Sequence, residues 1–467
     1  MTDFAALLTV DRRQPATILH KVTAAGFERW LKDQPQRART AIAAARFTGE
    51  PASVVILPGD KVDEWNAAAG VSEDGGPWDL AAAAQKLPEG RYRLAAQAEP
   101  GEAALGWLLA QHRFDAYRSV PKQEGPRTLL TTDPAAIDEV VRVAGAVAMV
   151  RDLVDTPSAE MGPDELEATA EALAKAHGAL CRTTRGDALE TGFPMIHAVG
   201  RAAARHRAPR LIEIEWGDPA HPRIAIVGKG VCFDSGGLDI KPSSGMLLMK
   251  KDMGGAAHAL ALARLVMEAG LPVHFHMIVP AVENAISADA FRPGDVLTSR
   301  QGLHVEIGNT DAEGRLILGD ALTLAGEGKA PELMIDFATL TGAARVALGP
   351  DLPALFANDE TLANDLLAAS HAAKDPLWRL PLWAPYNEML KSDLADINNA
   401  GSGGFAGSIT AALFLERFVD KQIPWAHLDT FAWNPVGRPG RPKGGEALGL
   451  RAAWTMLKAR FSPERRN

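Results

Sequence analysis

The sequence predicts an α/β protein whose larger, C-terminal part has helices flanking a mainly parallel central sheet. From about residue 160 onward, apolar stretches of strand length alternate with longer stretches whose apolar residues recur at helical spacing. Such alternation is typical of parallel strands joined by crossover helices that cover both faces of the sheet. Glycines and charged residues follow the apolar stretches, at the carboxyl ends of strands where open α/β sheets place their binding sites.

Helices and strands alternate along this part of the chain. A helix is expected where Pro163 opens an apolar-faced segment, and a buried strand is expected where a continuous apolar run ends in Gly228. The same criteria give helices at 163–177, 255–269, 316–325 and 409–418, and strands at 223–228, 272–279, 332–337 and 423–428.

The first 125 residues indicate a smaller mixed α/β region, with a strand at 53–58 and a helix at 103–110. A helix at 133–154 follows, with Asp133 as its N-cap and Pro134 at its first position. We therefore expect an N-terminal α/β domain at 1–130, a connecting helix at 131–160, and a domain that carries the chemistry at 161–467.

Composition restricts the class of protein. Hydrophobic residues make up 47% of the 467 residues and charged residues 23%, which is typical of a globular chain. No apolar window reaches the roughly 18 residues of a membrane span, and no signal peptide is evident, so we expect a cytoplasmic location without membrane association. The two cysteines predict no disulfide framework. The net charge of −9 argues against binding to a nucleic-acid backbone.

Acidic residues gather at the predicted strand ends and helix starts. Asp234 follows the strand at 223–228, Asp252 precedes the helix at 255–269, and Asp311 and Glu313 precede the helix at 316–325. Four converging carboxylates would repel one another and raise each other's pKa, whereas a pair of divalent cations would relieve that repulsion. Oxygen-rich ligation suits Mn²⁺, Mg²⁺ or Zn²⁺.

Each of these residues also has a simpler structural interpretation. Any one of the acids alone is more often a helix cap or a surface charge. The sequence has no P-loop, no His-Glu-x-x-His and no Gly-x-Ser-x-Gly. His274 and His276 alternate with apolar residues on one strand, which favours packed or hydrogen-bonded histidines over metal ligands. Cys232 has no basic partner at motif spacing and is expected to be a small packing residue.

Taken together, these motifs resemble the leucyl aminopeptidase (cytosol aminopeptidase) family. The resemblance covers residues 150 to 460, is most specific in Asn309–Leu316 (Asn-Thr-Asp-Ala-Glu-Gly-Arg-Leu), and is weak in the first 125 residues. The other matching segments are 228–237, 240–243, 251–257, 338–343 and 407–412.

The resemblance implies a two-metal site that takes Mn or Zn. Asp234 and Glu313 would bridge the two ions, Lys229 and Asp252 would complete the shell of one ion, and Asp311 would complete that of the other. Lys229 would have to bind as the neutral amine, so the ions would depress its pKa below the usual value of about 10.4.

The resemblance also implies roles outside the metal shell. Lys241 would polarise the scissile carbonyl and stabilise the gem-diolate. Arg315, together with Gly314, would hold a bicarbonate that takes a proton from the bridging water. Residues implied to line an apolar pocket for a leucine-like first side chain are Met249, Thr339, Leu340 and Gly342. Bulky Phe431 and Trp433 depart from the commoner family pattern, so the size of this pocket is open.

The function implied is a two-metal aminopeptidase that removes a leucine-like first residue from peptides with a free N-terminus through a metal-bridging water. A homohexamer would be its assembly. Two alternatives stay open: a nucleic-acid-binding regulator on the same scaffold, against which the net charge argues, and a catalytically inactive assembly protein, against which the complete ligand set argues.

Overall fold

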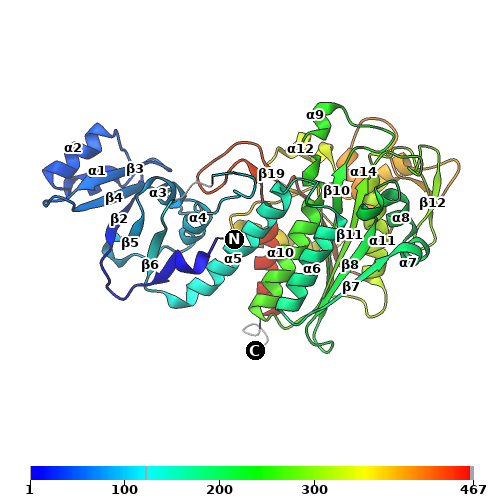
Figure 1. Ribbon diagram of the computed structural model, residues 1–467, viewed down its shortest axis with the longest axis horizontal. Coiled ribbons are helices and arrows are strands. Elements are labelled where there is room, and N and C mark those ends of the chain that lie inside the picture. Colours follow the sequence, from blue (N-terminus) through cyan, green and yellow to red (C-terminus); the bar gives the residue numbers. More distant parts are fainter. Residues whose placement is uncertain (1, 121–123, 463–467) are drawn as a thin grey trace. The chain divides into compact units, whose positions relative to one another are not determined.

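The computed structural model describes residues 2–120 and 124–462, which divide into two compact units. Of the described residues, the smaller unit comprises 2–120, 124–148 and 435–443, and the larger comprises 149–434 and 444–462. Figure 1 labels the elements of both units. Within the described residues, every helix is too short or too polar to cross a lipid bilayer.

The smaller unit is an α/β domain built on one six-stranded sheet. Its elements are β1 (Leu8–Val10), β2 (Thr17–Val22), α1 (Phe27–Lys32), α2 (Gln36–Ala44), β3 (Val54–Pro58), β4 (Trp65–Gly70), α3 (Ala81–Lys86), β5 (Gly90–Leu94), α4 (Ala103–Leu109) and β6 (Arg127–Thr131). The strands lie in the order β1-β6-β5-β2-β4-β3, and only the β3–β4 pair is antiparallel. The strand expected at 53–58 is β3, and the helix expected at 103–110 is α4.

Helix α5 (Pro134–Asp155) runs through the division between the two units. It begins where the sequence predicts, because Asp133 Oδ1 accepts hydrogen bonds from the N–H groups of Ala135 and Ala136, at 3.1 and 3.3 Å. The N-cap assigned to Asp133 is therefore confirmed.

The larger unit is built on a nine-stranded sheet whose central strands are parallel. Its strands are β7 (Leu180–Arg185), β8 (Arg210–Trp216), β9 (Arg223–Gly228), β10 (Gly230–Asp234), β11 (His274–Asn284), β14 (Leu333–Ala338), β15 (Ala354–Ala357), β16 (Trp378–Arg379) and β18 (Trp425–Asp429). The order is β16-β15-β18-β14-β9-β11-β8-β7, with β10 also paired to β11. Strands β18, β14, β9, β11 and β10 are parallel, whereas β15, β8 and β7 add antiparallel edges.

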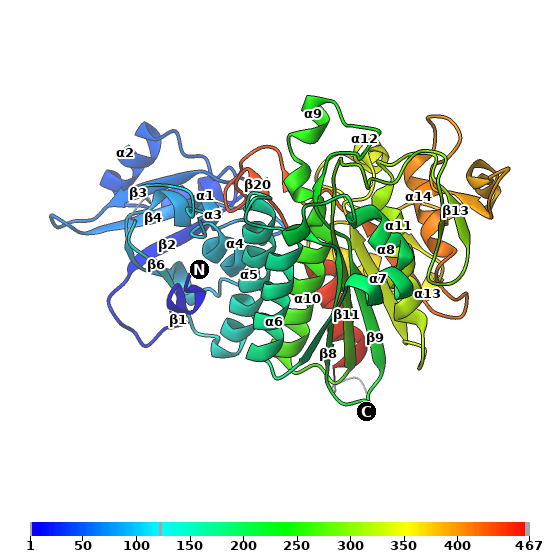
Figure 2. The ribbon, with the colours of Figure 1, turned by 45° about the vertical axis from the view of Figure 1, so that its right-hand side comes forward.

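Helices cover both faces of this sheet. They are α6 (Pro163–Ala176), α7 (Gly186–Gly192), α8 (Pro194–Gly200), α9 (Ser243–Met246), α10 (Gly254–Ala269), α11 (Glu313–Gly326), α12 (Gly342–Leu348), α13 (Glu360–Ala372), α14 (Gly407–Glu416) and α15 (Leu450–Phe461). Figure 2 shows α6 and α10 on one side of the sheet and α7, α8 and α11 on the other. Every residue of β9 is buried, and Ala225 and Val227 pack into the core formed with α8 and α11. The predicted fold class of this part, a mainly parallel sheet flanked by helices, is confirmed.

Two expectations about elements near the acidic residues were wrong in detail. Residues 230–234 lie outside every strand predicted from the sequence, yet they form strand β10, because Val231 and Cys232 are buried and the strand pairs with the end of β11. Helix α11 begins at Glu313 rather than at 316, so the acidic motif enters the first helical turn.

The carboxyl ends of the parallel strands place the chemically active segments at one edge of the sheet. Lys229 follows β9, Asp234 ends β10, Thr339 follows β14 and Asp429 ends β18. A short 3₁₀ helix, η4 (Met249–Met253), leads into α10 at the same edge. Residues far apart in sequence therefore meet where open α/β sheets hold their sites.

Candidate active site

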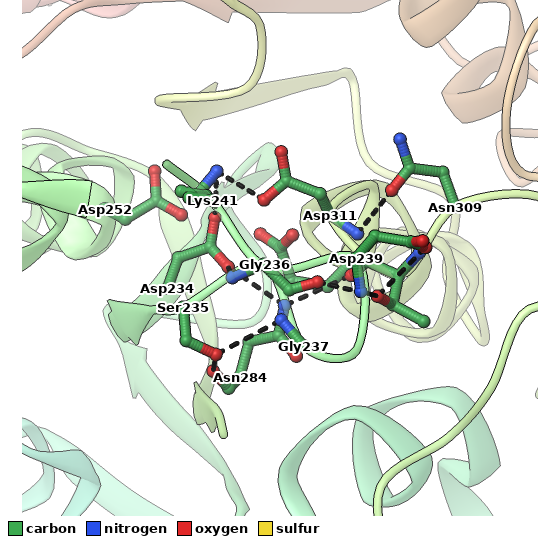
Figure 3. Close-up of polar contacts among 12 residues, drawn as sticks. Asp234, Ser235, Gly236, Gly237, Asp239, Lys241, Asp252, Asn284, Asn309 and Asp311 are labelled. Atoms are coloured by element: carbon green, nitrogen blue, oxygen red, sulfur yellow. Dashed lines mark hydrogen bonds and ion pairs between the residues drawn. The ribbon is translucent and has the colours of Figure 1, made fainter. Parts of the chain in front are cut away.

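Asp234 stands at the end of β10, where neighbouring groups fix its carboxylate (Figure 3). The N–H of Gly236 and the side-chain amide of Asn284 both donate to its Oδ1, at 2.9 Å. Gly236 has a φ of +88°, and a Cβ there would lie 2.6 Å from Asp239 O and 2.9 Å from Asp311 Oδ1. The turn therefore requires glycine, and it holds Asp234 close to Asp311.

Asp311 is held by a second loop that is bonded to the first (Figure 3). The Thr310 hydroxyl donates to Gly236 O at 2.6 Å, and the N–H of Thr310 donates to Asp239 Oδ2 at 2.8 Å. The N–H of Asp311 donates to Asn309 Oδ1 at 2.7 Å. These bonds fix the two loops, about seventy residues apart in sequence, in one geometry.

Lys229, Asp252 and Glu313 form a buried group beside this pair. Lys229 Nζ lies 2.7 Å from Asp252 Oδ2 and 3.0 Å from Glu313 Oε1. None of the three side chains is more than 3% exposed. Asp234, Asp252 and Glu313 each offer a carboxylate oxygen within 4.8 Å of the others. The four acids singled out in the sequence therefore converge.

Lys241 provides a second ammonium group at the site. Its Nζ lies 2.8 Å from Asp234 Oδ2 and forms an ion pair with Asp311. Burial alone would lower the pKa of Lys229 and of Lys241, but the adjacent carboxylates outweigh it and raise both pKa values. Both lysines are therefore charged in this arrangement.

Burial and mutual repulsion disfavour the charged form of two of the carboxylates. Burial, reinforced by Asp234, raises the pKa of Glu313 to about 8 and that of Asp311 to about 6. Among the described residues, nothing forms a hydrogen bond with Glu313 Oε2, although this oxygen is buried. A buried carboxylate oxygen without a partner is costly unless a cation binds it. The donor set therefore fits divalent metal ions.

A cavity of about 490 Å³ opens onto these groups. Lys229, Lys241, Asp234, Asp252 and Asp311 contribute to its wall. The four residues expected to line a substrate pocket are also at this wall: Met249, Thr339, Leu340 and Gly342. Met249 and Leu340 make part of this wall apolar.

Gly314 and Arg315 lie behind the cavity rather than at its wall. A Cβ on Gly314 would lie 2.5 Å from Lys229 Cε and 2.7 Å from its Nζ, so glycine there leaves room for the lysine. Arg315 Nη1 donates to Asn399 O at 2.7 Å, whereas its Nε has no hydrogen-bond partner among the described residues. Burial lowers the pKa of Arg315 to about 10, which leaves it charged at neutral pH.

Several residues of the site were not identified from the sequence. Asn284 and Asn399 bond the loops that carry Asp234 and Asp311, and no sequence motif marks them. Lys251 lines the cavity, and its place beside Asp252 in the motif was the only signal.

Two residues that the sequence set aside are placed as expected. Cys232 is buried, and burial raises the pKa of its thiol well above the usual value, which fits a packing residue. His276 is held between Arg223 Nη2, 3.0 Å from its Nδ1, and Glu213 Oε2, 2.9 Å from its Nε2. It is therefore a satisfied histidine, as predicted.

Comparison with known proteins identifies the fold. Residues 148–453 match the catalytic domain of the cytosol aminopeptidase family, and residues 18–131 match the N-terminal domain of M17 aminopeptidases. The chain belongs to the cytosol aminopeptidase family. The family predicted from the motifs and the two-domain fold are both confirmed, and the protein is an aminopeptidase, a hydrolase that acts on peptides.

Three similar proteins illustrate the relationship. A probable cytosol aminopeptidase of Syntrophotalea carbinolica is 43% identical over 370 residues, which cover 76% of this chain and 73% of that protein. The structure of the cytosol aminopeptidase from Coxiella burnetii matches with a TM-score of 0.92 and 44% identity, over 97% and 99% of the two chains. The bottromycin maturation enzyme BotP in complex with Mn matches with a TM-score of 0.85 and 32% identity, over 97% and 99%.

Proposed function

We propose that this chain is a two-metal aminopeptidase that releases the first residue, with a preference for leucine-like residues, from peptides with a free N-terminus. The observation that carries the proposal is the convergence of four carboxylates from three separate segments around Lys229 and Lys241, with the buried Glu313 Oε2 left without a hydrogen bond among the described residues. The alternative of an inactive scaffold would not explain this costly arrangement.

The residues proposed to hold the two ions are Lys229, Asp234, Asp252, Asp311 and Glu313. When bound, two divalent cations lower the pKa of a water and polarise a carbonyl. Lys229 is charged beside Asp252 and Glu313 in the structure. It must therefore lose a proton before its amine can coordinate a metal ion. Metal binding is therefore expected to release protons. Mn²⁺ and Zn²⁺ both suit the donor set, and the Mn complex of BotP supports Mn²⁺.

Lys241 is proposed to act on the substrate carbonyl. It lines the cavity and carries a full positive charge, so it can donate a hydrogen bond to the carbonyl oxygen and stabilise the negative charge that develops there. Its ion pairs with Asp234 and Asp311 hold the ammonium group at the cavity wall.

Arg315, with Gly314, is proposed to hold bicarbonate as the external general base. The partnerless Nε and the retained charge of Arg315 support binding of a small anion. Among the described residues, no side chain at the cavity wall is free to act as the general base. The acids there are already paired with lysines or with hydrogen-bond donors.

Met249, Thr339, Leu340 and Gly342 are proposed to receive the first side chain. Met249 and Leu340 provide apolar surface for a leucine-like residue. A homohexamer is proposed from the family resemblance, and a cytosolic location is supported by the names of the relatives. Light scattering of the purified chain measures the assembly directly.

The proposal is tested with the full-length protein loaded with Mn²⁺ or Zn²⁺. It should hydrolyse leucyl amide, lose that activity on chelation and regain it when metal is returned. N-acetyl-leucyl amide is the matched control, and it should resist hydrolysis because the free N-terminus is blocked. A protein that carries about two ions per chain and hydrolyses no aminoacyl amide or peptide would contradict the proposal.

A further inference from the structure

Lys251 is a buried ammonium group at the wall of the cavity. Its side chain is 6% exposed, and its Nζ makes no hydrogen bond with any described residue. Its one ion-pair contact, with Asp252 Oδ1, spans 3.8 Å, which is beyond hydrogen-bond distance. Because Lys251 faces the cavity, a ligand that supplies a charged acceptor at this point would form a charge-assisted hydrogen bond with it.

Nearby acids are already committed to other partners. Asp252 has an ion pair with Lys229 at 2.7 Å and accepts a hydrogen bond from the Thr339 hydroxyl at 2.8 Å. Asp429 accepts hydrogen bonds from the N–H groups of Leu340 and Thr341, at 3.0 and 3.2 Å, and one from the Thr341 hydroxyl at 2.6 Å. The acceptor that Lys251 lacks must therefore come from outside the chain.

A second cation and an aromatic ring lie next to Lys251. Lys251 Nζ is 5.2 Å from the centroid of the Phe431 ring, and the guanidinium carbon of Arg345, on α12, is 4.9 Å from the same centroid. All three residues line the cavity. The Phe431 ring contacts both cations, so this part of the wall presents two positively charged groups.

We propose that this positively charged wall receives the carboxylate of an acidic first residue, so that the pocket accepts N-terminal glutamate or aspartate as well as leucine-like residues. The methylene groups of such a side chain lie along Met249 and Leu340, and its carboxylate accepts hydrogen bonds from Lys251. Arg345 adds long-range attraction from the rim. The inference rests on the proposed function, because it names a substrate class for the same cavity.

The discriminating comparison is glutamyl amide against glutaminyl amide, which have nearly the same shape and differ in charge. The wild-type chain should hydrolyse glutamyl amide with the higher kcat/KM, by roughly tenfold or more, because a hydrogen bond to a charged group is lost with glutamine. Lys251→Met should abolish this preference while hydrolysis of leucyl amide continues. Free glutamate should also inhibit the wild type more strongly than free glutamine, and Lys251→Met should remove that difference.

Lys250→Met is the matched control. Lys250 is the adjacent lysine and also stacks on an aromatic ring, with its Nζ 5.6 Å from the Trp433 centroid. It does not line the cavity, and its Nζ donates to the carbonyl oxygen of Asp155. This variant should keep the wild-type ratio of glutamyl to glutaminyl hydrolysis.

Two results would overturn the inference, and they are distinguishable from failure of the proposed function. One is a wild-type enzyme that hydrolyses leucyl amide but does not prefer glutamyl over glutaminyl amide. The other is a preference that survives in Lys251→Met. Because the wild-type comparison needs no variant, the first result stands even if Lys251→Met fails to fold. A metal-loaded chain that hydrolyses none of the three amides would contradict the proposed function itself.

Discussion

Replacement of Lys241 by methionine tests the proposed division between metal ligands and the group that acts on the substrate. Methionine keeps most of the side-chain length but removes the ammonium group that lies 2.8 Å from Asp234 Oδ2. Lys241 is not among the proposed ligands, so the variant should bind as many metal ions as the wild type.

The expected loss of activity follows from the role of the ammonium group. Removal of one preorganised donor to the developing negative charge costs about 10²- to 10³-fold in kcat, or about 3 to 4 kcal/mol of transition-state stabilisation. Lys241 is 15% exposed, so little water can replace it. The value of KM for leucyl amide should change much less than kcat, since the interaction develops mainly in the transition state.

The assay is steady-state hydrolysis of leucyl amide together with elemental analysis of the same protein samples. Lys391→Met is the surface control, because Lys391 is 69% exposed in an ion pair with Glu388 and should leave both measurements unchanged. Wild-type turnover in Lys241→Met would refute the assigned role. Loss of metal from that variant would instead make Lys241 part of the metal shell.

Three further predictions concern neighbouring groups. Asp252→Ala should lose the ion at one of the two metal sites, measured by elemental analysis, because Asp252 is proposed as a ligand of that ion. Gly314→Ala should reduce kcat on the order of 10²-fold, since its Cβ would displace Lys229, from whose Cε it would lie 2.5 Å. Asp336→Ala should destabilise the fold by about 3–5 kcal/mol in denaturant unfolding, because it leaves the fully buried His427 without its ion-pair partner, 2.6 Å away. Burial alone would lower the pKa of His427, but the charge of Asp336 outweighs burial and raises that pKa. The ion pair should therefore stabilise the folded state fully below pH about 6.5, the ordinary pKa of histidine. This contribution should decline as the pH rises through the raised pKa of His427.

Each of these predictions has a contradicting result. Unchanged metal content in Asp252→Ala would exclude that residue as a ligand. Gly326→Ala, at the other end of α11, is the control for Gly314→Ala because its Cβ would meet only Ile423 Cδ1, at 3.4 Å, and equal activity of the two variants would be contradictory. For Asp336→Ala, wild-type stability, or wild-type pH dependence of stability, would show that the buried pair contributes nothing.

Much of the fold could be predicted because the local order of apolar, polar and capping residues indicates which segments are buried and where helices begin. The continuous apolar run that becomes β9 has to be a strand buried on both faces, and Asp133 followed by Pro134 defines the start of α5. Strand β10 was missed because it is only five residues long, it follows β9 after a single residue, and its pairing with β11 depends on tertiary contacts. The same reason applies to Glu313, whose inclusion in α11 depends on the loop that precedes it.

The candidate site could be predicted only in part. The acids that converge were visible as motifs, but the sequence could not show that Lys241 pairs with Asp234 and Asp311, since loop geometry decides side-chain direction. The hydrogen bond from Asn284 to Asp234 could not be predicted, because a single asparagine at the end of a strand belongs to no recognisable sequence motif. Lys251 was adjacent to a recognised ligand, yet only the structure shows that its ammonium group faces the cavity.

The most direct test of the central claim is a titration of metal-free protein with Mn²⁺, in which bound metal, released protons and hydrolysis of leucyl amide are measured on the same samples. The account predicts about two ions per chain, release of protons on binding, and activity that is absent without metal and restored with it. Undiminished hydrolysis by the metal-free protein, or binding of no Mn²⁺ or Zn²⁺ at all, would contradict it.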